Sequence, residues 1–157
     1  MKINVRKAKA SDIGGIAYSW AGLLDYHEKI DLSYYKRSKN AMENYKRFVR
    51  KCLKDANKMF YVALINGKVA GHIGLDIKHR PPIFSTVRYG YIIDAFVLET
   101  FRKRGVFKVL LKEAEKWFRK KKVSFIEMRI SAKDDTGIKI WEKVGFEERV
   151  RMMHRKL

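Results

Sequence analysis

The apolar and polar residues of this chain alternate with two different periods, and the order of these periods predicts a mixed α/β fold. Strand-like runs of apolar and β-branched residues occupy residues 2–9, 59–65, 68–77, 87–98, 124–130 and 148–155. Apolar residues spaced three and four positions apart, as in amphipathic helices, occupy residues 11–27, 41–53, 106–118 and 135–144. We therefore expect one domain over residues 1–157, with the element order β-α-α-β-β-β-α-β-α-β.

Two short turn signals support this order. Ser11 and Asp12 precede the first helical pattern, and their side-chain oxygens suit a helix N-cap. Asn66 and Gly67 separate two strand-like runs, and this dipeptide favours a type I′ hairpin because both of its central residues need positive φ. The sequence thus predicts a hairpin centred on Asn66 and Gly67.

The most informative segment is residues 91–121, where an apolar strand, a basic turn and an amphipathic helix follow one another directly. The turn and the start of the helix consist of Arg102, Lys103, Arg104, Gly105, Val106, Phe107 and Lys108. Free backbone N–H groups at a helix start bind anions, and a glycine there lets the backbone approach a phosphate closely. The segment predicts a phosphate site, although a solvated connector would have the same composition.

Charge and cysteine content indicate the kind of partner and the cellular compartment of the protein. The chain has 36 Lys and Arg against 17 Asp and Glu, a formal net charge of +19 that attracts polyanions such as nucleic acid or the ribosome. A lysine-rich proteome would produce the same excess without a functional meaning. The lone Cys52 excludes an intramolecular disulfide and suggests a reducing, cytoplasmic setting. No apolar stretch is long enough to cross a membrane, and the N-terminus reads as a strand rather than a signal peptide.

The order of elements resembles the GCN5-related N-acetyltransferases, and the resemblance covers essentially the whole chain. The pyrophosphate signature of that family is Gln/Arg-x-x-Gly-x-Gly/Ala, placed after the fourth strand. Here Arg102 and Gly105 match it, and Phe107 stands where the family has a small residue. A phenyl ring there must point away from the cofactor or shift it; helical spacing with Leu111 also fits a core residue.

A second family pattern is Asn, then Tyr seven residues later, then Gly-Phe. In this chain it reads Asp134, Trp141 and Gly145-Phe146, so the spacing is kept while two polar identities differ. The family commonly assigns protonation of the leaving thiolate to that tyrosine. An indole N–H donates a hydrogen bond but does not act as an acid near neutral pH. Trp141 therefore either lines the cleft in the place of the acid or packs in the core.

The resemblance implies the fold and the donor. The fold would be a single-domain mixed sheet whose fourth and fifth strands splay around a CoA cleft. The cofactor would be acetyl-CoA, with its pyrophosphate on the residues Arg102 to Lys108 named above. The backbone of Phe96, Val97 and Leu98 would pair with the pantetheine arm, and Asp134 and Trp141 would complete the cofactor site.

Two carboxylates are candidates for the base that accepts the proton of the amine. Asp94 lies in an otherwise apolar strand, three residues before Val97. Glu127 lies where some protein N-terminal acetyltransferases of the resembled family carry a catalytic glutamate. Buried carboxylates have a raised pKa and can serve as bases. The alternative is that each one pairs with a cation such as Arg129, or accepts a backbone hydrogen bond.

The acceptor site is expected at the first two helices. Residues 25–31 carry three acidic residues against one lysine, an acidic patch that would attract an amine. Tyr26, His27 and Asp31 come from this patch, and Tyr91 of the fourth strand is a further candidate. The alternative is that His27 packs in the core and the acids solvate a helix end. The four histidines lack the spacing of metal ligands, so we expect no metal.

The sequence thus predicts a CoA-dependent N-acyltransferase that moves an acetyl group from acetyl-CoA to a primary amine. The acceptor would be a small molecule or a peptide or protein amino group. The alternative function is a non-catalytic module that binds acyl-CoA or a polyanion such as nucleic acid. Related folds often form homodimers, but the sequence carries no legible interface pattern.

Overall fold

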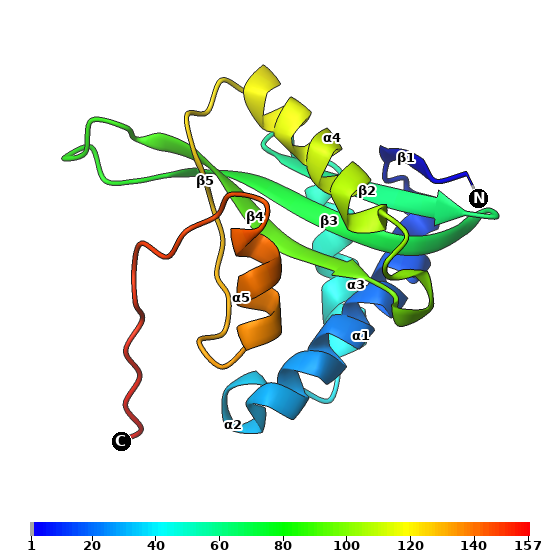
Figure 1. Ribbon diagram of the computed structural model, residues 1–157, viewed down its shortest axis with the longest axis horizontal. Coiled ribbons are helices and arrows are strands. Elements are labelled where there is room, and N and C mark those ends of the chain that lie inside the picture. The colour runs from blue at the N-terminus through cyan, green and yellow to red at the C-terminus, as the bar shows by residue number, and fades with distance from the viewer. Residues whose placement is uncertain (1) are drawn as a thin grey trace.

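The computed structural model describes residues 2–157 and contains a mixed five-stranded sheet with the strand order β1-β2-β3-β4-β5 (Figure 1). The strands are β1 (Asn4–Lys7), β2 (Lys58–Ile65), β3 (Lys68–His79), β4 (Arg88–Val97) and β5 (Ile126–Glu127). The first four strands pair antiparallel in sequence order, whereas β5 runs parallel to β4. The expected α/β fold with a mixed sheet is therefore confirmed.

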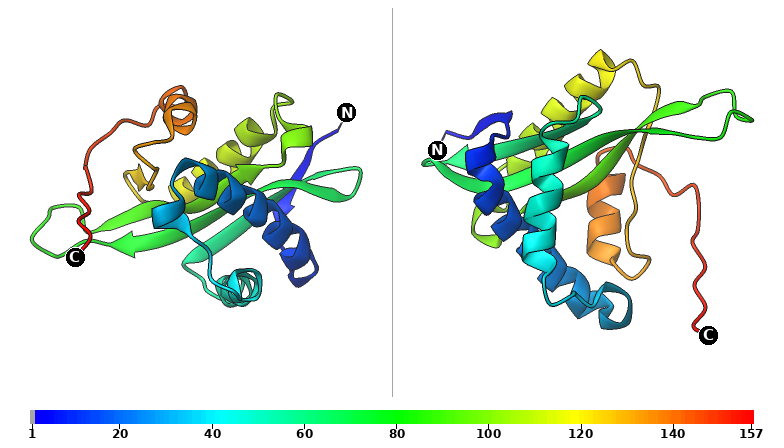
Figure 2. Two further views of the ribbon diagram at one scale, coloured as in Figure 1. Left: turned by 90° about the horizontal axis from the view of Figure 1, so that it is seen from below. Right: turned by 180° about the vertical axis from the view of Figure 1, so that it is seen from behind.

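Helices cover both faces of this sheet. They are α1 (Ile13–Ile30), α2 (Leu32–Tyr35), α3 (Ala41–Cys52), α4 (Val106–Lys120) and α5 (Asp135–Glu142), with short 3₁₀ turns η1 (Ala10–Asp12) and η2 (Glu99–Phe101). Figure 2 shows α4 and α5 on one face and α1 and α3 on the other. The N-terminal helices and the C-terminal helices are therefore on opposite sides of the central strands.

Each face has its own apolar cluster. On the α4 face, Leu110 and Phe118 pack with Ile73 of β3, and all three side chains are buried. On the other face, Ile16 of α1 and Val49 of α3 pack with residues of β2. Successive side chains of a strand point to opposite faces, so the central strands supply both clusters. This explains why β2 and β3 read as nearly continuous apolar runs.

The hairpin between β2 and β3 forms at the position that the sequence predicts. Asn66 and Gly67 adopt φ angles of 51° and 75°, the two positive values of a type I′ turn. The turn sets the register of β2 against β3. The expected hairpin is therefore confirmed.

The fourth and fifth strands diverge. They pair only at Gly90 with Ile126 and at Tyr91 with Glu127, while β4 continues to Val97 with no partner on that edge among the described residues. Next to this point, Ile93 is an extra residue in the ladder between β3 and β4, a bulge that bends β4. The strand expected over residues 124–130 is therefore shorter than predicted, because β4 turns away from it.

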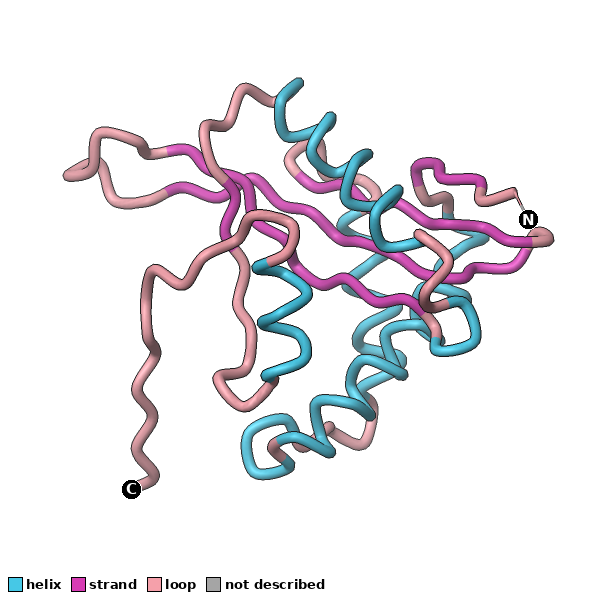
Figure 3. Tube along the Cα trace, viewed as in Figure 1, coloured by secondary structure: helices cyan, strands magenta, loops and turns pink. Residues whose placement is uncertain are grey.

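The last expected strand, over residues 148–155, is not formed. This segment is a loop that leads away from the sheet (Figure 3). Val150 and Met153 are 82% and 90% exposed, so the apolar residues reach no core. Arg149 and Arg151 form ion pairs with glutamates of the same segment rather than with the sheet. Alternation alone predicted a strand here, but a strand also needs an edge to pair with.

The start of α1 carries a pH-dependent contribution to stability. Asp12, one of the two residues that the sequence offers for this position, is the N-cap, but its side chain makes no capping hydrogen bond to the helix. The Asp12 carboxylate accepts hydrogen bonds from the Arg6 guanidinium at 2.7 and 3.0 Å and from the Lys9 N–H at 2.7 Å. The guanidinium, and then the Lys9 N–H, lower the pKa of Asp12 against the opposing effect of burial. The folded state therefore favours the ionised form of the Asp12 carboxyl group.

We expect Asp12→Asn to lower the free energy of unfolding by about 2 kcal/mol at pH 7, since a charge-assisted hydrogen bond is lost. Because the pKa of Asp12 is lower in the folded state, this stabilisation is present above about pH 4 and disappears as the pH falls further. Urea melts of both proteins at pH 7 and pH 3 measure it. An equal difference between the two proteins at both pH values would contradict this explanation.

Candidate active site

The basic turn places an open helix N-terminus at the end of β4. Gly105 is the N-cap of α4 with φ of 80°, and Lys103 also has a positive φ of 58°. No side chain caps this end, and the first turn of the helix contains no acidic residue. The first backbone hydrogen bond runs from the Val109 N–H to the Gly105 carbonyl, so the preceding N–H groups of the helix point out of it unpaired along the backbone. Glycine is needed at 105 for its positive φ.

The side chains of this turn are well placed for an anion. Arg102, Lys103, Arg104 and Lys108 are all exposed, and they bracket the helix start. The helix dipole adds a partial positive charge at the same place. The predicted phosphate site is therefore an exposed cationic helix terminus. A solvated connector would be exposed as well, so the phosphate role stays a prediction.

The end of β4 offers one of the three predicted backbone sites. The Leu98 N–H donates to the Ala70 carbonyl at 2.9 Å, so the amide of Leu98 faces β3 and is not free for a ligand. Adjacent residues of a strand point their backbone groups to opposite edges, so Val97 faces the open edge. Its carbonyl accepts a hydrogen bond from Arg102 Nε at 3.2 Å. The prediction for Leu98 is therefore wrong for its N–H, while Val97 fits.

A groove of about 980 Å³ lies beside this strand end, between α1 and η2. It is lined by Tyr18, Tyr26, Lys68, Phe96, Phe101 and Arg102, among others. The Arg102 guanidinium carbon lies 5.2 Å from the centre of the Phe96 ring. The groove therefore brings together the predicted cofactor residues Phe96 and Arg102 and the predicted acceptor residue Tyr26.

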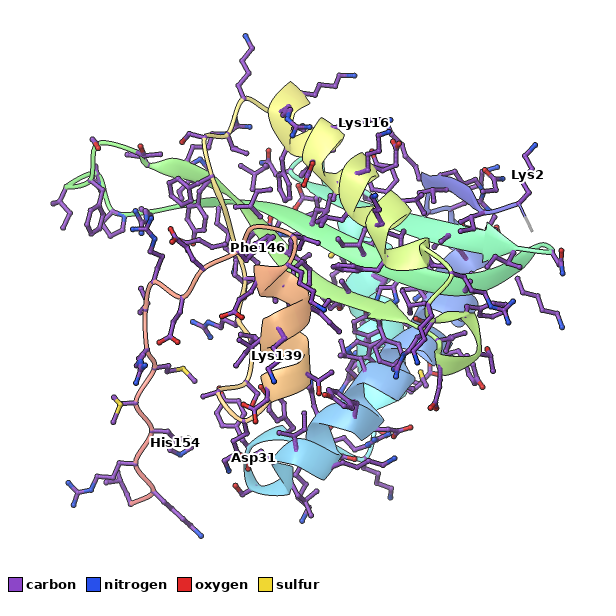
Figure 4. The ribbon with its side chains drawn as sticks, in the orientation of Figure 1. Lys2, Asp31, Lys116, Lys139, Phe146 and His154 are labelled. Atoms are coloured by element: carbon purple, nitrogen blue, oxygen red, sulfur yellow. The ribbon has the colours of Figure 1, made fainter. Side chains whose placement is uncertain are left out.

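The two residues that differ from the family signatures, Phe107 and Trp141, contact each other. The ring of Phe107, in the first turn of α4, lies edge-on to the ring of Trp141 in α5, with 5.0 Å between centroids. Trp141 makes a second edge-on contact with Phe146, whose place at the end of α5 is labelled in Figure 4. All three rings pack against the cluster on the α4 face. An aromatic contact between α4 and α5 thus replaces the small residue and the tyrosine of the family pattern.

Asp134 joins α1 to α5. Its side chain is buried, and Oδ1 accepts hydrogen bonds from the Tyr26 hydroxyl at 2.6 Å and from the Gly137 N–H at 2.8 Å. The second bond caps the start of α5. The hydrogen bond to Asp134, together with burial, raises the pKa of Tyr26. Two residues predicted for different ligands, Asp134 for the cofactor and Tyr26 for the acceptor, are therefore bonded to each other.

The acids of the expected acidic patch are engaged in ion pairs within the fold. Arg37 forms ion pairs with both Asp25 and Glu28, and Lys133 Nζ lies 2.7 Å from Asp31 Oδ2. Figure 4 shows Asp31 beside the loop that leads into α5. The acids of residues 25–31 thus hold α1, α2 and the neighbouring loops together. One guanidinium is shared by two carboxylates, so only part of the negative charge is compensated, and Asp25 also lines the groove.

His27 is the remaining acceptor candidate of this region. Its ring stacks on that of Tyr35 with 4.5 Å between centroids. Burial lowers the pKa of His27, so the imidazole is neutral at pH 7. This arrangement fits a packed residue.

Asp94 belongs to a buried polar network that the sequence did not reveal. The Tyr45 hydroxyl donates to Asp94 Oδ2 at 2.7 Å, and His72 Nε2 lies 3.2 Å from Asp94 Oδ1. His72 Nδ1 lies 2.9 Å from the hydroxyl of Ser19. A His72 proton on Nε2 satisfies every group, because Ser19 then donates to Nδ1. Both oxygens of Asp94 are therefore occupied.

The members of this network come from four elements, α1, α3, β3 and β4, which explains why spacing along the chain gave no sign of it. His72 and Ser19 are completely buried. The signal that could have found them is a histidine in the middle of the apolar run of β3. Buried polar groups need partners, and His72 requires two.

Glu127 lies where β4 and β5 meet. It pairs with Tyr91 across the two strands, at the last contact before they diverge. Its Oε1 lies 3.2 Å from Arg80 Nη2, and 40% of its side chain is exposed. Of the two predicted bases, Glu127 is thus the exposed one, at the apex of the opening, and Tyr91 lies beside it. The contacts of Tyr91 do not include Tyr26, His27 or Asp31, so the four acceptor candidates form two separate groups.

Two further searches concern the described residues only. None of their histidines, cysteines and carboxylates gather in a group of three or more that suits a metal ion. None of the helices over residues 2–157 combines the length and the apolar character that crossing a membrane requires.

Comparison with known proteins identifies the family. Residues 23–146 match the model of the acetyltransferase (GNAT) family. The chain belongs to the GNAT family. The match covers α4, its basic turn and the Trp141 region, so Phe107 and Trp141 both lie inside the part of the chain that matches the GNAT family.

Relatives with stated activities match part of the chain. An L-amino acid N-acetyltransferase of Escherichia coli (strain K12) is 31% identical over 90 residues, covering 55% of this chain and 51% of the relative. An N-alpha-acetyltransferase of Sulfolobus acidocaldarius is 32% identical over 112 residues, covering 65% of this chain and 64% of the relative. The chain thus spans between half and two thirds of the length of these GNAT relatives.

A solved structure extends the likeness to nearly the whole chain. A predicted acetyltransferase from Clostridium acetobutylicum, crystallised with acetyl-CoA, has a TM-score of 0.79 at 20% identity. The alignment covers 99% of this chain and 96% of that one. At this identity the likeness concerns the GNAT fold alone.

Proposed function

We propose that this GNAT protein is a CoA-dependent N-acetyltransferase that moves an acetyl group from acetyl-CoA to a primary amine. One observation carries the proposal. The open edge of β4 ends directly at the uncapped, cationic N-terminus of α4. A ligand that combines a peptide-like arm with a pyrophosphate fits this arrangement, because the arm needs a strand edge and the phosphates need N–H donors and positive charge.

The residues present fit the donor. Val97 has its carbonyl on the open edge, where Arg102 Nε occupies it at 3.2 Å. An arm that pairs with β4 takes over this carbonyl, and the exposed Arg102 side chain becomes available to the phosphates at the start of α4. Lys103, Arg104 and Lys108 surround the same N-terminus. Arg102 therefore holds the strand edge in the free protein and binds the donor in the complex.

The chemistry assigns one proton-transfer role to the protein. When bound, acetyl-CoA supplies the activated acyl group: the amine nitrogen bonds to the acetyl carbon, the carbon–sulfur bond breaks, and the thiolate leaves. Glu127 accepts the proton that the ammonium loses, directly or through water. Trp141 cannot protonate the thiolate, but a thiol with a pKa of about 8.5 is a fair leaving group and solvent can protonate it.

Titration calorimetry with CoA, followed by measurement of thiol release from acetyl-CoA, tests the proposal. The amine panel comprises free amino acids, small polyamines and peptides with free N-termini. We expect a 1:1 complex with CoA and acetyl-dependent thiol release with at least one class of amine. Absence of CoA binding would overturn this function and also the alternative of a non-catalytic acyl-CoA binder.

Neutralising one cation of the helix start should weaken donor binding selectively. We expect Lys108→Gln to raise the Kd for CoA about fivefold, because one charge-assisted contact to a phosphate is lost. The matched control is Lys120→Gln, an exposed lysine of the same helix about 18 Å further along it. Calorimetry at fixed ionic strength compares the two. Equal effects would assign the change to net charge rather than to the site.

The aromatic contact between Phe107 and Trp141 favours one alternative, a non-catalytic module that binds acyl-CoA or a polyanion. This contact fills the place of the small residue and of the tyrosine that family members use. A pure binder would bind CoA and release no thiol with any amine of the panel. Thiol release that depends on both acetyl-CoA and an amine decides against it.

The setting and the partners of the protein remain parts of this proposal. A single, buried Cys52 supports a reducing, cytoplasmic environment. The net charge of +19 supports contact with a nucleic acid or the ribosome. A homodimer is the usual assembly of related folds, and analytical ultracentrifugation measures it directly.

A further inference from the structure

One face of the sheet has an unusual mixture of cations and aromatic rings beside Glu127. The β3–β4 hairpin projects beyond the helices at the left of Figure 1, on the side of β5. Cross-strand partners share a face, and Asp76 pairs with Tyr91 while Lys78 pairs with Tyr89. Side chains on this face of β3, β4 and β5 are Lys78, Tyr89, Tyr91 and Glu127. Phe125, just before β5, stacks on Tyr89, and the charge of Arg129, two residues after β5, acts on Tyr91. The six residues are thus Lys78, Tyr89, Tyr91, Phe125, Glu127 and Arg129. We call this set the hairpin face.

The rings of the hairpin face already have partners. Tyr89 stacks on Phe125 with 5.5 Å between centroids and 14° between planes. Lys78 Nζ lies 3.5 Å from the centre of the Tyr91 ring. The Arg80 guanidinium carbon lies 5.1 Å from the centre of Phe125. These contacts hold Lys78 and Arg80 against the aromatic residues of the face.

The charges on this face are unequally compensated. Asp76 is paired with Lys58 at 2.7 Å, and Glu127 with Arg80 at 3.2 Å. Lys78 and Arg129 have no ion pair with a carboxylate among the described residues, and Arg129 is exposed. The charge of Arg129 also opposes the rise in the pKa of Tyr91 that burial causes. Two uncompensated cations therefore stand on either side of the candidate base.

The donor geometry directs the acceptor to this face. An arm that enters at Val97 and follows β4 ends where β4 and β5 meet, at Tyr91 and Glu127. From Val97 to Tyr91 is about 20 Å of strand. An amine that attacks at this apex must have the rest of its molecule beyond the apex. The next groups that it meets there belong to the hairpin face.

We propose that the hairpin face binds the acidic N-terminal segment of an acceptor protein. The α-amino group lies at Glu127, and side-chain carboxylates within the first few residues lie at Lys78 and Arg129. This inference rests on the proposed function and adds the substrate class to it. Lys78 lies opposite Tyr89 of β4, whereas Arg129 lies two residues past Glu127, the partner of Tyr91. The two positions are therefore separated by two strand spacings and by about four residues along the strands, roughly 16 Å in all. About five residues of extended peptide span that distance, whereas a small amine does not.

A peptide fits better than a nucleic acid for two reasons. Bases that stack on Tyr89, Tyr91 or Phe125 would compete with the cations and rings that already contact these residues. Phosphates would also meet Glu127 and Asp76 on the same face, whereas an N-terminal ammonium needs one carboxylate. The alternation of one carboxylate with flanking cations therefore matches an ammonium followed by carboxylates.

Two synthetic peptides test the inference. They share their length and N-terminal serine, and they differ only at positions two to four, Asp-Glu-Asp in one and Asn-Gln-Asn in the other. We expect the acidic peptide to have at least a tenfold higher kcat/KM, mostly through a lower KM. The ratio should fall when the salt concentration is raised to 0.5 M, since exposed charges are then screened. A ratio of one, or a preference for the amide peptide, would overturn the inference.

Matched variants locate the effect. Lys78→Gln combined with Arg129→Gln should reduce the ratio at least fivefold, while Lys112→Gln combined with Lys120→Gln, the same charge change on α4, leaves it unchanged. An unchanged Kd for CoA confirms that each variant is folded. An equal loss of the ratio in both double variants would assign the preference to net charge. Competition by oligouridylate that the hairpin-face variant abolishes would assign the face to nucleic acid. Either result overturns the inference. Binding of CoA with no acetylation of any amine would instead overturn the proposed function.

Discussion

Replacing Glu127 by Gln should lower kcat for acetyl transfer by about 100-fold, the lower end of what a positioned general base contributes. Glu127 lies at the apex of the opening between β4 and β5. The substitution keeps the shape of the side chain and removes its ability to accept a proton. Because Lys108 and the α4 terminus are untouched, the Kd for CoA should be unchanged. Steady-state thiol release and calorimetry measure the two quantities.

The chain offers a closely matched control for this experiment. Glu115 of α4 pairs with Arg119 at 3.3 Å with 36% of its side chain exposed, against 3.2 Å and 40% for Glu127 with Arg80. Glu115→Gln therefore breaks an equivalent ion pair on another surface and should leave kcat within twofold. If Glu127→Gln also retains kcat within twofold, Glu127 is not the base. Raising the pH should partly restore the activity of Glu127→Gln, because a larger fraction of the amine is then neutral.

The largest effect on stability is expected for His72→Leu, about 3 kcal/mol of the free energy of unfolding. His72 bridges Ser19 and Asp94 in a site with no exposed surface. Leucine leaves the buried carboxylate with the Tyr45 hydroxyl alone and leaves the Ser19 hydroxyl without its acceptor. For a chain of this length, the loss corresponds to a fall in Tm of about 6–12 °C. Calorimetric melts and urea titrations measure it.

His79→Leu is the control, since His79 is exposed at the end of the same strand. We expect its Tm to differ from that of the wild type by less than about 2 °C. Ser19→Ala should be intermediate, about 1 kcal/mol, because it removes only the outer hydrogen bond of the network. If His72→Leu is as stable as His79→Leu, the network does not stabilise the fold.

Local sequence signals predicted the elements that depend on nearby residues. The hairpin at Asn66 and Gly67 follows from their tolerance of positive φ. Helix α4 follows from the spacing of its apolar face, and its open N-terminus follows from Gly105 and the basic turn. In each case the interactions that decide the structure lie within a few residues. The expected strand over 148–155 failed because pairing depends on a distant edge.

The same distinction between local and distant interactions applies to the candidate site. Its donor half could be predicted from the sequence because a phosphate-binding helix start is one continuous segment. The acceptor half was not, because ion pairs between segments far apart in the chain determine which acids are free. Arg37 and Lys133 form ion pairs with the three acids of residues 25–31, while Lys78 and Arg129 have no ion pair with a carboxylate among the described residues. Net charge along a segment cannot reveal such pairing.

The sequence by itself therefore determined the order of elements, the hairpin, the basic helix start and the resemblance to acetyltransferases. These depend on periodicity and on turn chemistry, which act over a few residues. The tertiary structure alone decided that Phe107 packs on Trp141, that Asp94 is bonded to Tyr45 and His72, and that Glu127 stays exposed at the apex. These contacts join residues many positions apart, so only the folded chain brings their side chains within bonding distance.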